Sequence, residues 1–341
     1  MKTNKTNLKS RIFAVMVSVM LLATCFMSTT AFAQGESEAS KTTFEFTKVL
    51  NVEENVLVPP AEFNFTVETG KAIYDAEKNI NVDEGVSGNI SVDKATFAAN
   101  DPSTQKVAID FSEVNFVAPG NYHYVLKETN DNQQGIKYDA TAYDLYVTVA
   151  YGKDDNLVIT NYTMIDPSDN NTESKNDGNI INTYETSNLT LKKEVKGNQG
   201  NKNKEFNFTI TFNGGTKDTV LNIIGSDNNT TITIDEDGKA TANVKLSNGE
   251  SVTVYGLTKD MTYDIQETEA NQNGYVTTVT EGEKSGTITD TDTDVSVTFT
   301  NTKEGTVPTG ILLETAPYMI LGAVVLAGIV VLFVTRRRRS H

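Results

Sequence analysis

Polar residues recur in this chain at strand positions that the sequence pattern assigns to a hydrophobic core. Successive side chains of a β-strand point to opposite faces, so every second residue shares a face. In the segment FEFTK, Lys48 shares a face with two phenylalanines, and in LTLKK, Lys193 shares a face with two leucines. The same alternation turns four further polar side chains inward: Glu128, Asn182, Glu267 and Asn301. Because buried ionisable groups are costly unless they are paired or react, this pattern constrains both fold and chemistry.

These six residues belong to two copies of one module. The sequence EFNFT occurs at 62–66 and again at 205–209. Both copies keep the order Lys, EFNFT, Glu, Asn, and the first copy has a longer segment before its Asn. Ordered matches at several places indicate a duplication. We therefore expect two domains, at residues 34–185 and 186–304.

The local pattern predicts an all-β chain. Short alternating runs rich in Thr, Val and aromatic residues are typical of strands, and no convincing amphipathic helix occurs between residues 40 and 304. Asp237-Gly238 and Asn248-Gly249 are candidate hairpin turns. Repeated antiparallel strands of this kind favour two tandem immunoglobulin-like β-sandwiches.

The N-terminal segment 1–33 predicts a secretory signal peptide. A basic start is followed by a short apolar stretch and by Ala-Phe-Ala, so we expect cleavage between Ala33 and Gln34. A transmembrane anchor is the alternative, but the apolar stretch is short. A lipoprotein site at Cys25 is a second alternative, although Thr24 is bulkier than the residue usually found before that cysteine.

Composition excludes several classes of function. Cys25 is the only cysteine, so the secreted chain would have no disulfide, and His123 and His341 are the only histidines. We therefore expect no cofactor, no metal site and no Ser/His or Cys/His catalytic set. The Asp290-x-Asp292-x-Asp294 run lacks the rest of a calcium loop and is interpreted as a solvated strand face. The formal net charge of −16 argues against nucleic acid as a partner.

The C-terminal segment 305–341 has the layout of a cell-wall sorting signal. Val-Pro-Thr-Gly at 307–310 precedes an uncharged apolar run at 316–334, which is long enough to span a bilayer. Four arginines at 336–339 follow and would hold that end in the cytoplasm. The arrangement resembles sortase substrates, which are cut between Thr and Gly, here Thr309 and Gly310. A permanent single-pass anchor is the alternative.

Further segments carry a family resemblance. They are FSEVNFVAPG at 111–120, YDATAY at 138–143, LTLKK at 189–193, VTFTN at 297–301 and VPTG at 307–310. In this order and spacing the chain resembles streptococcal T-antigen-like major backbone pilins with pilin isopeptide linkage domains. The resemblance implies two CnaB-type sandwiches, each with one internal Lys–Asn isopeptide bond and a nearby Glu. It also implies a pilin-type (class C) sortase, minor pilins and peptidoglycan as partners, and a cell-wall-anchored pilus as the location.

The chemistry of the six residues agrees with that implication. Burial lowers the pKa of a lysine, so that its neutral amine can attack, and a carboxyl in an apolar pocket can stay protonated and relay protons. Lys48 is the expected nucleophile, Asn182 the acceptor and Glu128 the proton relay. Lys193, Asn301 and Glu267 take the same roles in the second copy. The alternative is that each polar residue ends its strand and reaches water.

A polymer also needs an amine on every subunit. Lys175 is the only lysine in the polar segment 169–179, and its distance from Asn182 matches the linking lysine of the resembled pilins. An ordinary surface lysine is the alternative, and the usual Tyr-Pro-Lys motif is absent. The sequence thus favours a major pilus subunit joined through Thr309–Lys175 links. A monomeric wall-anchored adhesin is the alternative, and an enzyme is disfavoured because each triad is consumed by its own reaction.

Overall fold

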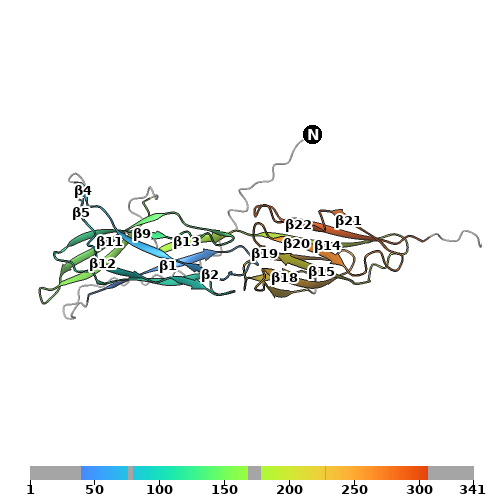
Figure 1. Ribbon diagram of the computed structural model, residues 1–341, viewed down its shortest axis with the longest axis horizontal. Coiled ribbons are helices and arrows are strands. Elements are labelled where there is room, and N and C mark those ends of the chain that lie inside the picture. Colours follow the sequence, from blue (N-terminus) through green and yellow to red (C-terminus); the bar gives the residue numbers. More distant parts are fainter. Residues whose placement is uncertain (1–39, 76–79, 168–177, 227, 306–341) are drawn as a thin grey trace, which may run out of the picture.

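The computed structural model describes residues 40–75, 80–167, 178–226 and 228–305, and the regular elements within these ranges are all β-strands. Two β-sandwiches lie end to end and form an elongated molecule (Figure 1). Two separate hydrophobic clusters fill them. The predicted boundary between residues 185 and 186 falls in the short link between β13 and β14. No helix within the described ranges is long and apolar enough to cross a membrane.

The first sandwich is built from thirteen strands. They are β1 Thr43–Asn51, β2 Ala61–Phe63, β3 Phe65–Thr69, β4 Ile73–Asp75, β5 Ile80–Glu84, β6 Asn89–Val92, β7 Ala95–Phe97, β8 Thr104–Glu113, β9 Gly120–Glu128, β10 Ile136–Lys137, β11 Ala142–Tyr151, β12 Leu157–Ile165 and β13 Asn179–Tyr184. One sheet has the order β10-β13-β1-β8-β6, and the facing sheet has the order β12-β11-β9-β5-β4, with β3 also paired to β9. The first strand, β1, is parallel to the last, β13, and antiparallel to β8.

The second sandwich is built from ten strands. They are β14 Ser187–Lys196, β15 Phe206–Asn213, β16 Val220–Ile224, β17 Thr230–Thr233, β18 Lys239–Leu246, β19 Ser251–Leu257, β20 Thr262–Glu267, β21 Val276–Glu281, β22 Ser285–Thr287 and β23 Val295–Thr302. Its sheets have the orders β17-β16-β19-β14-β23-β21 and β18-β15-β20-β22. Here too the first strand, β14, is parallel to the last, β23.

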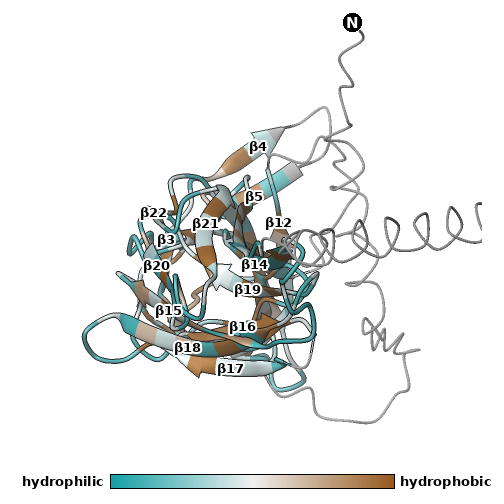
Figure 2. Ribbon diagram, turned by 90° about the vertical axis from the view of Figure 1, so that its right-hand side faces the viewer, coloured by the Kyte–Doolittle hydropathy of each residue, from teal (hydrophilic) through white to brown (hydrophobic). Residues whose placement is uncertain are grey.

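Period-two alternation explains most of these strands. In β15 every second residue is buried and the others are partly exposed, so one face contributes Phe206, Phe208, Ile210 and Phe212 to the core. Hydrophobic and hydrophilic stretches alternate along the strands when the molecule is viewed down its long axis (Figure 2). The all-β sandwich prediction is confirmed.

The two candidate hairpin turns are a correction to the sequence prediction. Gly238 and Gly249 do adopt positive φ, at 74° and 84°, as tight turns require. The strands on either side of each turn belong to different sheets, because β18 pairs with β15 whereas β17 and β19 both pair with β16. Turn residues reverse the chain locally, but the neighbours of each strand are chosen by the sheet that buries its apolar face.

The two sandwiches contact each other directly. The Nδ2 of Asn222 donates to the carbonyl oxygen of Asn55 at 2.9 Å, and the Nε2 of Gln134 donates to that of Gly214 at 2.9 Å. Tyr255 of the second sandwich packs against the core of the first. These contacts give the two units a defined junction.

Candidate functional site

In each sandwich the candidate Lys and Asn lie on adjacent parallel strands with the same offset. Lys48 on β1 stands opposite Ile180 of β13, two residues before Asn182. Lys193 on β14 stands opposite Phe299 of β23, two residues before Asn301. Because the offset is two, both side chains of each pair lie on the same face, towards the core.

The glutamate comes from the facing sheet. Glu128 ends β9, and Glu267 ends β20. In both sandwiches this strand belongs to the sheet opposite the Lys and Asn strands. The carboxylate therefore reaches across the core and joins the two sheets at one polar point.

The first triad is buried, and the Glu128 carboxylate accepts hydrogen bonds from both other members. Lys48 Nζ donates to Glu128 Oε2 at 2.9 Å, and Asn182 Nδ2 donates to Glu128 Oε1 at 2.8 Å. Lys48 and Asn182 are 0% exposed, and the side chain of Glu128 is 1% exposed. Lys48 Nζ lies 4.8 Å from the ring centroid of Phe63 and 5.9 Å from that of Phe65.

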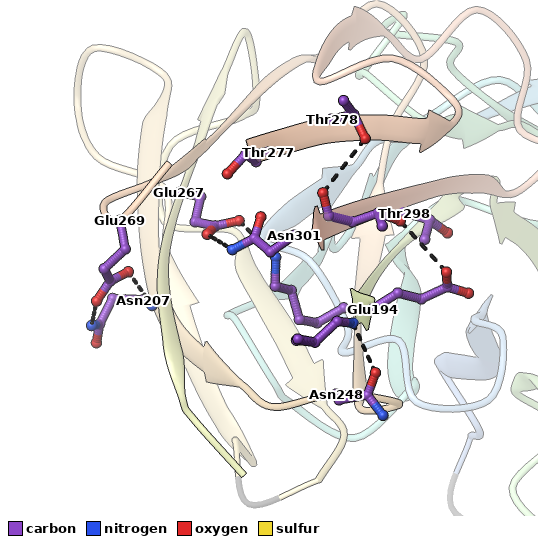
Figure 3. A network of polar contacts seen from close by, with 12 residues as sticks. Glu194, Asn207, Asn248, Glu267, Glu269, Thr277, Thr278, Thr298 and Asn301 are labelled. Carbon is purple, nitrogen blue, oxygen red and sulfur yellow. Dashed lines mark hydrogen bonds and ion pairs between the residues drawn. The ribbon is translucent and has the colours of Figure 1, made fainter. Parts of the chain in front are cut away.

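The second triad repeats this arrangement. Lys193 Nζ donates to Glu267 Oε2 at 2.9 Å, and Asn301 Nδ2 donates to Glu267 Oε1. Figure 3 shows the Asn301 amide and the Glu267 carboxylate facing each other. The ring centroids of Phe206 and Phe208 lie 4.4 and 5.6 Å from Lys193 Nζ. The EFNFT repeat thus supplies both aromatic walls, in the first copy as well as the second.

Burial shifts the pKa values of Lys48, Lys193 and Glu128 in the directions that the sequence predicts. Desolvation lowers the pKa of Lys48 to about 8 even though the Glu128 carboxylate opposes the shift. Desolvation likewise lowers the pKa of Lys193 and raises that of Glu128. The neutral amine and the neutral acid are therefore more accessible here than in water.

The carbonyl oxygens of the two asparagines differ in their contacts. The backbone N–H of Asp139 donates to Asn182 Oδ1 at 2.8 Å. Asn301 Oδ1 is buried and has no hydrogen-bond partner among the described residues. The role of Asp139 could not be predicted from the sequence, because a backbone donor leaves no residue-type signal.

Lys192 is exposed, as the alternation predicts. Five residues lie outside the described ranges: Ala33, Gln34, Lys175, Thr309 and Gly310. No group in the described part of the chain has the donors to hold a metal ion. The Asp290–Asp294 run lies in the loop between β22 and β23, so the interpretation as a strand face is wrong. Asp290 accepts from the backbone N–H of Asp292, and Asp294 accepts from the side chain of Asn188.

Comparisons with known proteins agree with this geometry. Residues 44–185 match the Spy0128-like isopeptide containing domain, and residues 187–303 match a domain family of unknown function. A pilin of Streptococcus pyogenes serotype M1 is 28% identical over 326 residues, which covers 89% of this chain and 93% of that protein.

Two solved structures are similar over nearly their whole length. The major pilin from Streptococcus pyogenes matches with a TM-score of 0.58 and 27% identity, covering 77% of this chain and 99% of that one. The T3.2 major pilin of the same species matches with a TM-score of 0.56 and 25% identity, covering 78% and 99%. Residues 44–185 therefore match the Spy0128-like isopeptide containing domain, and over most of its length the chain is similar to major pilins of Streptococcus pyogenes.

Proposed function

We propose that this chain is the major structural subunit of a covalently assembled surface pilus, and not an enzyme with turnover. The proposal is supported by the similarity to major pilins over most of the chain and by two sandwiches that lie end to end. The observation that carries it is the pair of buried Lys–Glu–Asn triads in equivalent register. Each sandwich is a load-bearing unit closed by its own crosslink, with residues 34–185 and 186–304 as the two domains.

Each triad forms one amide bond as the sandwich folds. The neutral amine of Lys48 attacks Cγ of Asn182, so that a C–N bond forms and the bond from Cγ to Nδ2 breaks. Glu128 takes a proton from Nζ and delivers one to Nδ2, which leaves as ammonia. Lys193, Asn301 and Glu267 react in the same way. Folding aligns the groups and makes the exchange effectively unimolecular.

The position of the crosslinks suits a tensile rod. Each bond joins the first and last strands of its sandwich, which are parallel neighbours. A pull on the two ends of a sandwich would shear the hydrogen bonds between these strands. The covalent bond bypasses that ladder and carries the load.

Polymerisation uses residues beyond the described ranges. A pilin-type (class C) sortase cuts between Thr309 and Gly310 and passes the Thr309 carbonyl to Lys175 of the next subunit. Secretion follows removal of residues 1–33, and the C-terminal segment holds the precursor in the membrane before sorting. The finished fibre is attached to peptidoglycan and carries minor pilins.

The mass of the secreted domains tests the crosslinks. We expect the purified residues 34–305 to be lighter than their sequence by two molecules of ammonia, because each amide bond releases one. Digestion should yield one branched peptide that joins Lys48 to Asn182 and another that joins Lys193 to Asn301. A protein with its full sequence mass, and with both lysines free, would refute the proposal.

A further inference from the structure

The two triads share their Lys, Glu and Asn geometry but differ at the oxygen of the acceptor amide. Asn182 Oδ1 receives the backbone N–H of Asp139, whereas Asn301 Oδ1 has no donor within the described part of the structure. This oxygen is the atom on which negative charge develops when an amine attacks the amide carbon. A donor at that point acts directly on the barrier.

The difference arises from where one strand ends. In the first sandwich, β10 pairs with the acceptor strand only at Ile136 and Lys137, with Lys137 opposite Thr183. In the second sandwich, Val276 of β21 stands opposite Thr302, the equivalent position, but the pairing continues through Thr277 opposite Asn301 and beyond. β21 therefore stays in the ladder, whereas the chain after β10 leaves it and turns the N–H of Asp139 onto Asn182.

The segment that presents this N–H is anchored by its own side chain. Asp139 Oδ1 accepts from the backbone N–H of Thr141 at 2.8 Å, and Asp139 Oδ2 accepts from the hydroxyl of Tyr143 at 2.5 Å. Tyr143 lies on β11 opposite Leu126 of β9, the strand that carries Glu128. The donor and the proton relay are thus fixed to the same sheet.

We propose that the N–H of Asp139 is a catalytic hydrogen-bond donor for the first crosslink, and that the second crosslink forms without an equivalent. The inference rests on the proposed crosslink chemistry. As Lys48 Nζ bonds to Cγ of Asn182, the carbonyl π pair moves onto Oδ1, and the N–H already in contact stabilises that charge. The oxyanion then collapses, the bond from Cγ to Nδ2 breaks, and ammonia leaves with the proton that Glu128 delivers. A donor already in place requires no reorganisation during the reaction.

A proline substitution removes the donor. The full secreted domains would be made by cell-free synthesis, quenched at intervals in acid and denaturant, and digested, and both branched peptides would be quantified. In Asp139→Pro we expect the Lys48–Asn182 bond to form about 10²–10³-fold more slowly than in the wild type, because one oxyanion donor is worth that factor. The Lys193–Asn301 bond in the same molecule should form at its usual rate. Asp139→Ala keeps the N–H and should form the first bond much faster than Asp139→Pro.

Two results would overturn the assignment. The first is that Asp139→Pro forms the Lys48–Asn182 bond at the wild-type rate. The second is that Asp139→Ala and Asp139→Pro slow this bond equally, which would assign the effect to the Asp139 side chain. If instead the wild type itself gave neither branched peptide, the proposed crosslink chemistry would fail first. If the wild type forms both bonds, the crosslink chemistry holds, and a negative result in the variants then counts against the Asp139 donor alone.

Hydrogen exchange tests the contact between the Asp139 N–H and Asn182 even if Asp139→Pro does not fold. In Glu128→Gln, where the first bond cannot form, the amide of Asp139 should be protected from exchange by its contact with Asn182. The additional change Asn182→Ala should remove that protection while the strand amides of β1 and β8 keep theirs. Equal exchange of the Asp139 amide in the two proteins would exclude the contact and with it the proposal.

Discussion

Glu128→Gln is expected to abolish the Lys48–Asn182 crosslink and to lower the melting temperature of the first sandwich by roughly 10–20 °C. The glutamine keeps the size and shape of the side chain but cannot relay protons, so the amine and the amide stay unreacted. A crosslink that closes a loop longer than 100 residues restricts the unfolded chain by about 5 kcal/mol in the disulfide model. For a domain of this size, that loss corresponds to about 2–4 °C per kcal/mol. The unreacted lysine would also remain buried next to a neutral amide, which adds a desolvation cost.

Mass spectrometry and scanning calorimetry on the same samples check this prediction. Glu128→Gln should lose one molecule of ammonia fewer than the wild type, and Glu267→Gln should behave likewise in the second sandwich. The double variant should keep its full sequence mass. Lys192→Ala is the matched control, because Lys192 is the exposed neighbour of buried Lys193. A Glu128→Gln protein with the wild-type mass deficit, or with an unchanged melting temperature, would contradict the assigned role.

The residues of the triads were predictable because strong alternation fixes the face of a strand without knowledge of its neighbours. Lys48 follows two phenylalanines at spacing two, and it is fully buried in the structure. The order Lys, Glu, Asn occurs in both copies, and equivalent residues of a repeat occupy equivalent places in the two domains. The repeat therefore indicated which Lys, Glu and Asn belong together. The local pattern and the internal repeat together predicted six buried polar side chains. Four of them lie within strands, and the two glutamates end the strands β9 and β20.

Pairing between distant strands was not predictable in the same way. The sequence does not state that the two strands around Gly238 separate into different sheets, because that choice depends on apolar surfaces formed elsewhere in the chain. β23 gives a second example. Thr298 and Thr300 alternate with buried apolar residues, yet both are buried. Their hydroxyls contact side chains of the neighbouring strands: Thr298 donates to Glu281, and Thr300 lies against Thr280 and Glu194.

The donor at Asp139 illustrates the same limit at the functional site. The hydrogen bond to Asn182 is donated by the backbone N–H of Asp139 and does not depend on the residue type. It forms because the pairing of β10 with β13 ends at Lys137. Lys137 and Val276 occupy equivalent positions, opposite Thr183 and Thr302, and the two copies diverge after this residue. Two copies of one module can therefore carry the same reactive side chains and still differ in the electrostatics around the acceptor.

Lys175→Ala is expected to abolish the ladder of high-mass species that the wild-type protein should give on denaturing gels of cell-wall extracts. Each added subunit needs one acyl donor, Thr309, and one amine acceptor, so removal of the amine stops chain growth after a single subunit. Amide links survive boiling in detergent, and the ladder therefore reports covalent joining and no weaker association. The substitution lies outside both triads and should leave the two internal crosslinks intact by mass.

Paired variants separate the donor from the acceptor. Thr309→Ala should also abolish the ladder, and cells that produce both Lys175→Ala and Thr309→Ala subunits should yield a covalent dimer, because one protein retains the acceptor and the other the acyl group. Lys192→Ala should polymerise normally, since its exposed amine is not the one that reacts. A full ladder from Lys175→Ala would assign the link to another lysine. A single wall-released band from the wild type would instead favour a monomeric adhesin, because covalent growth is the property that distinguishes a shaft subunit from an anchored binding protein built from the same sandwiches.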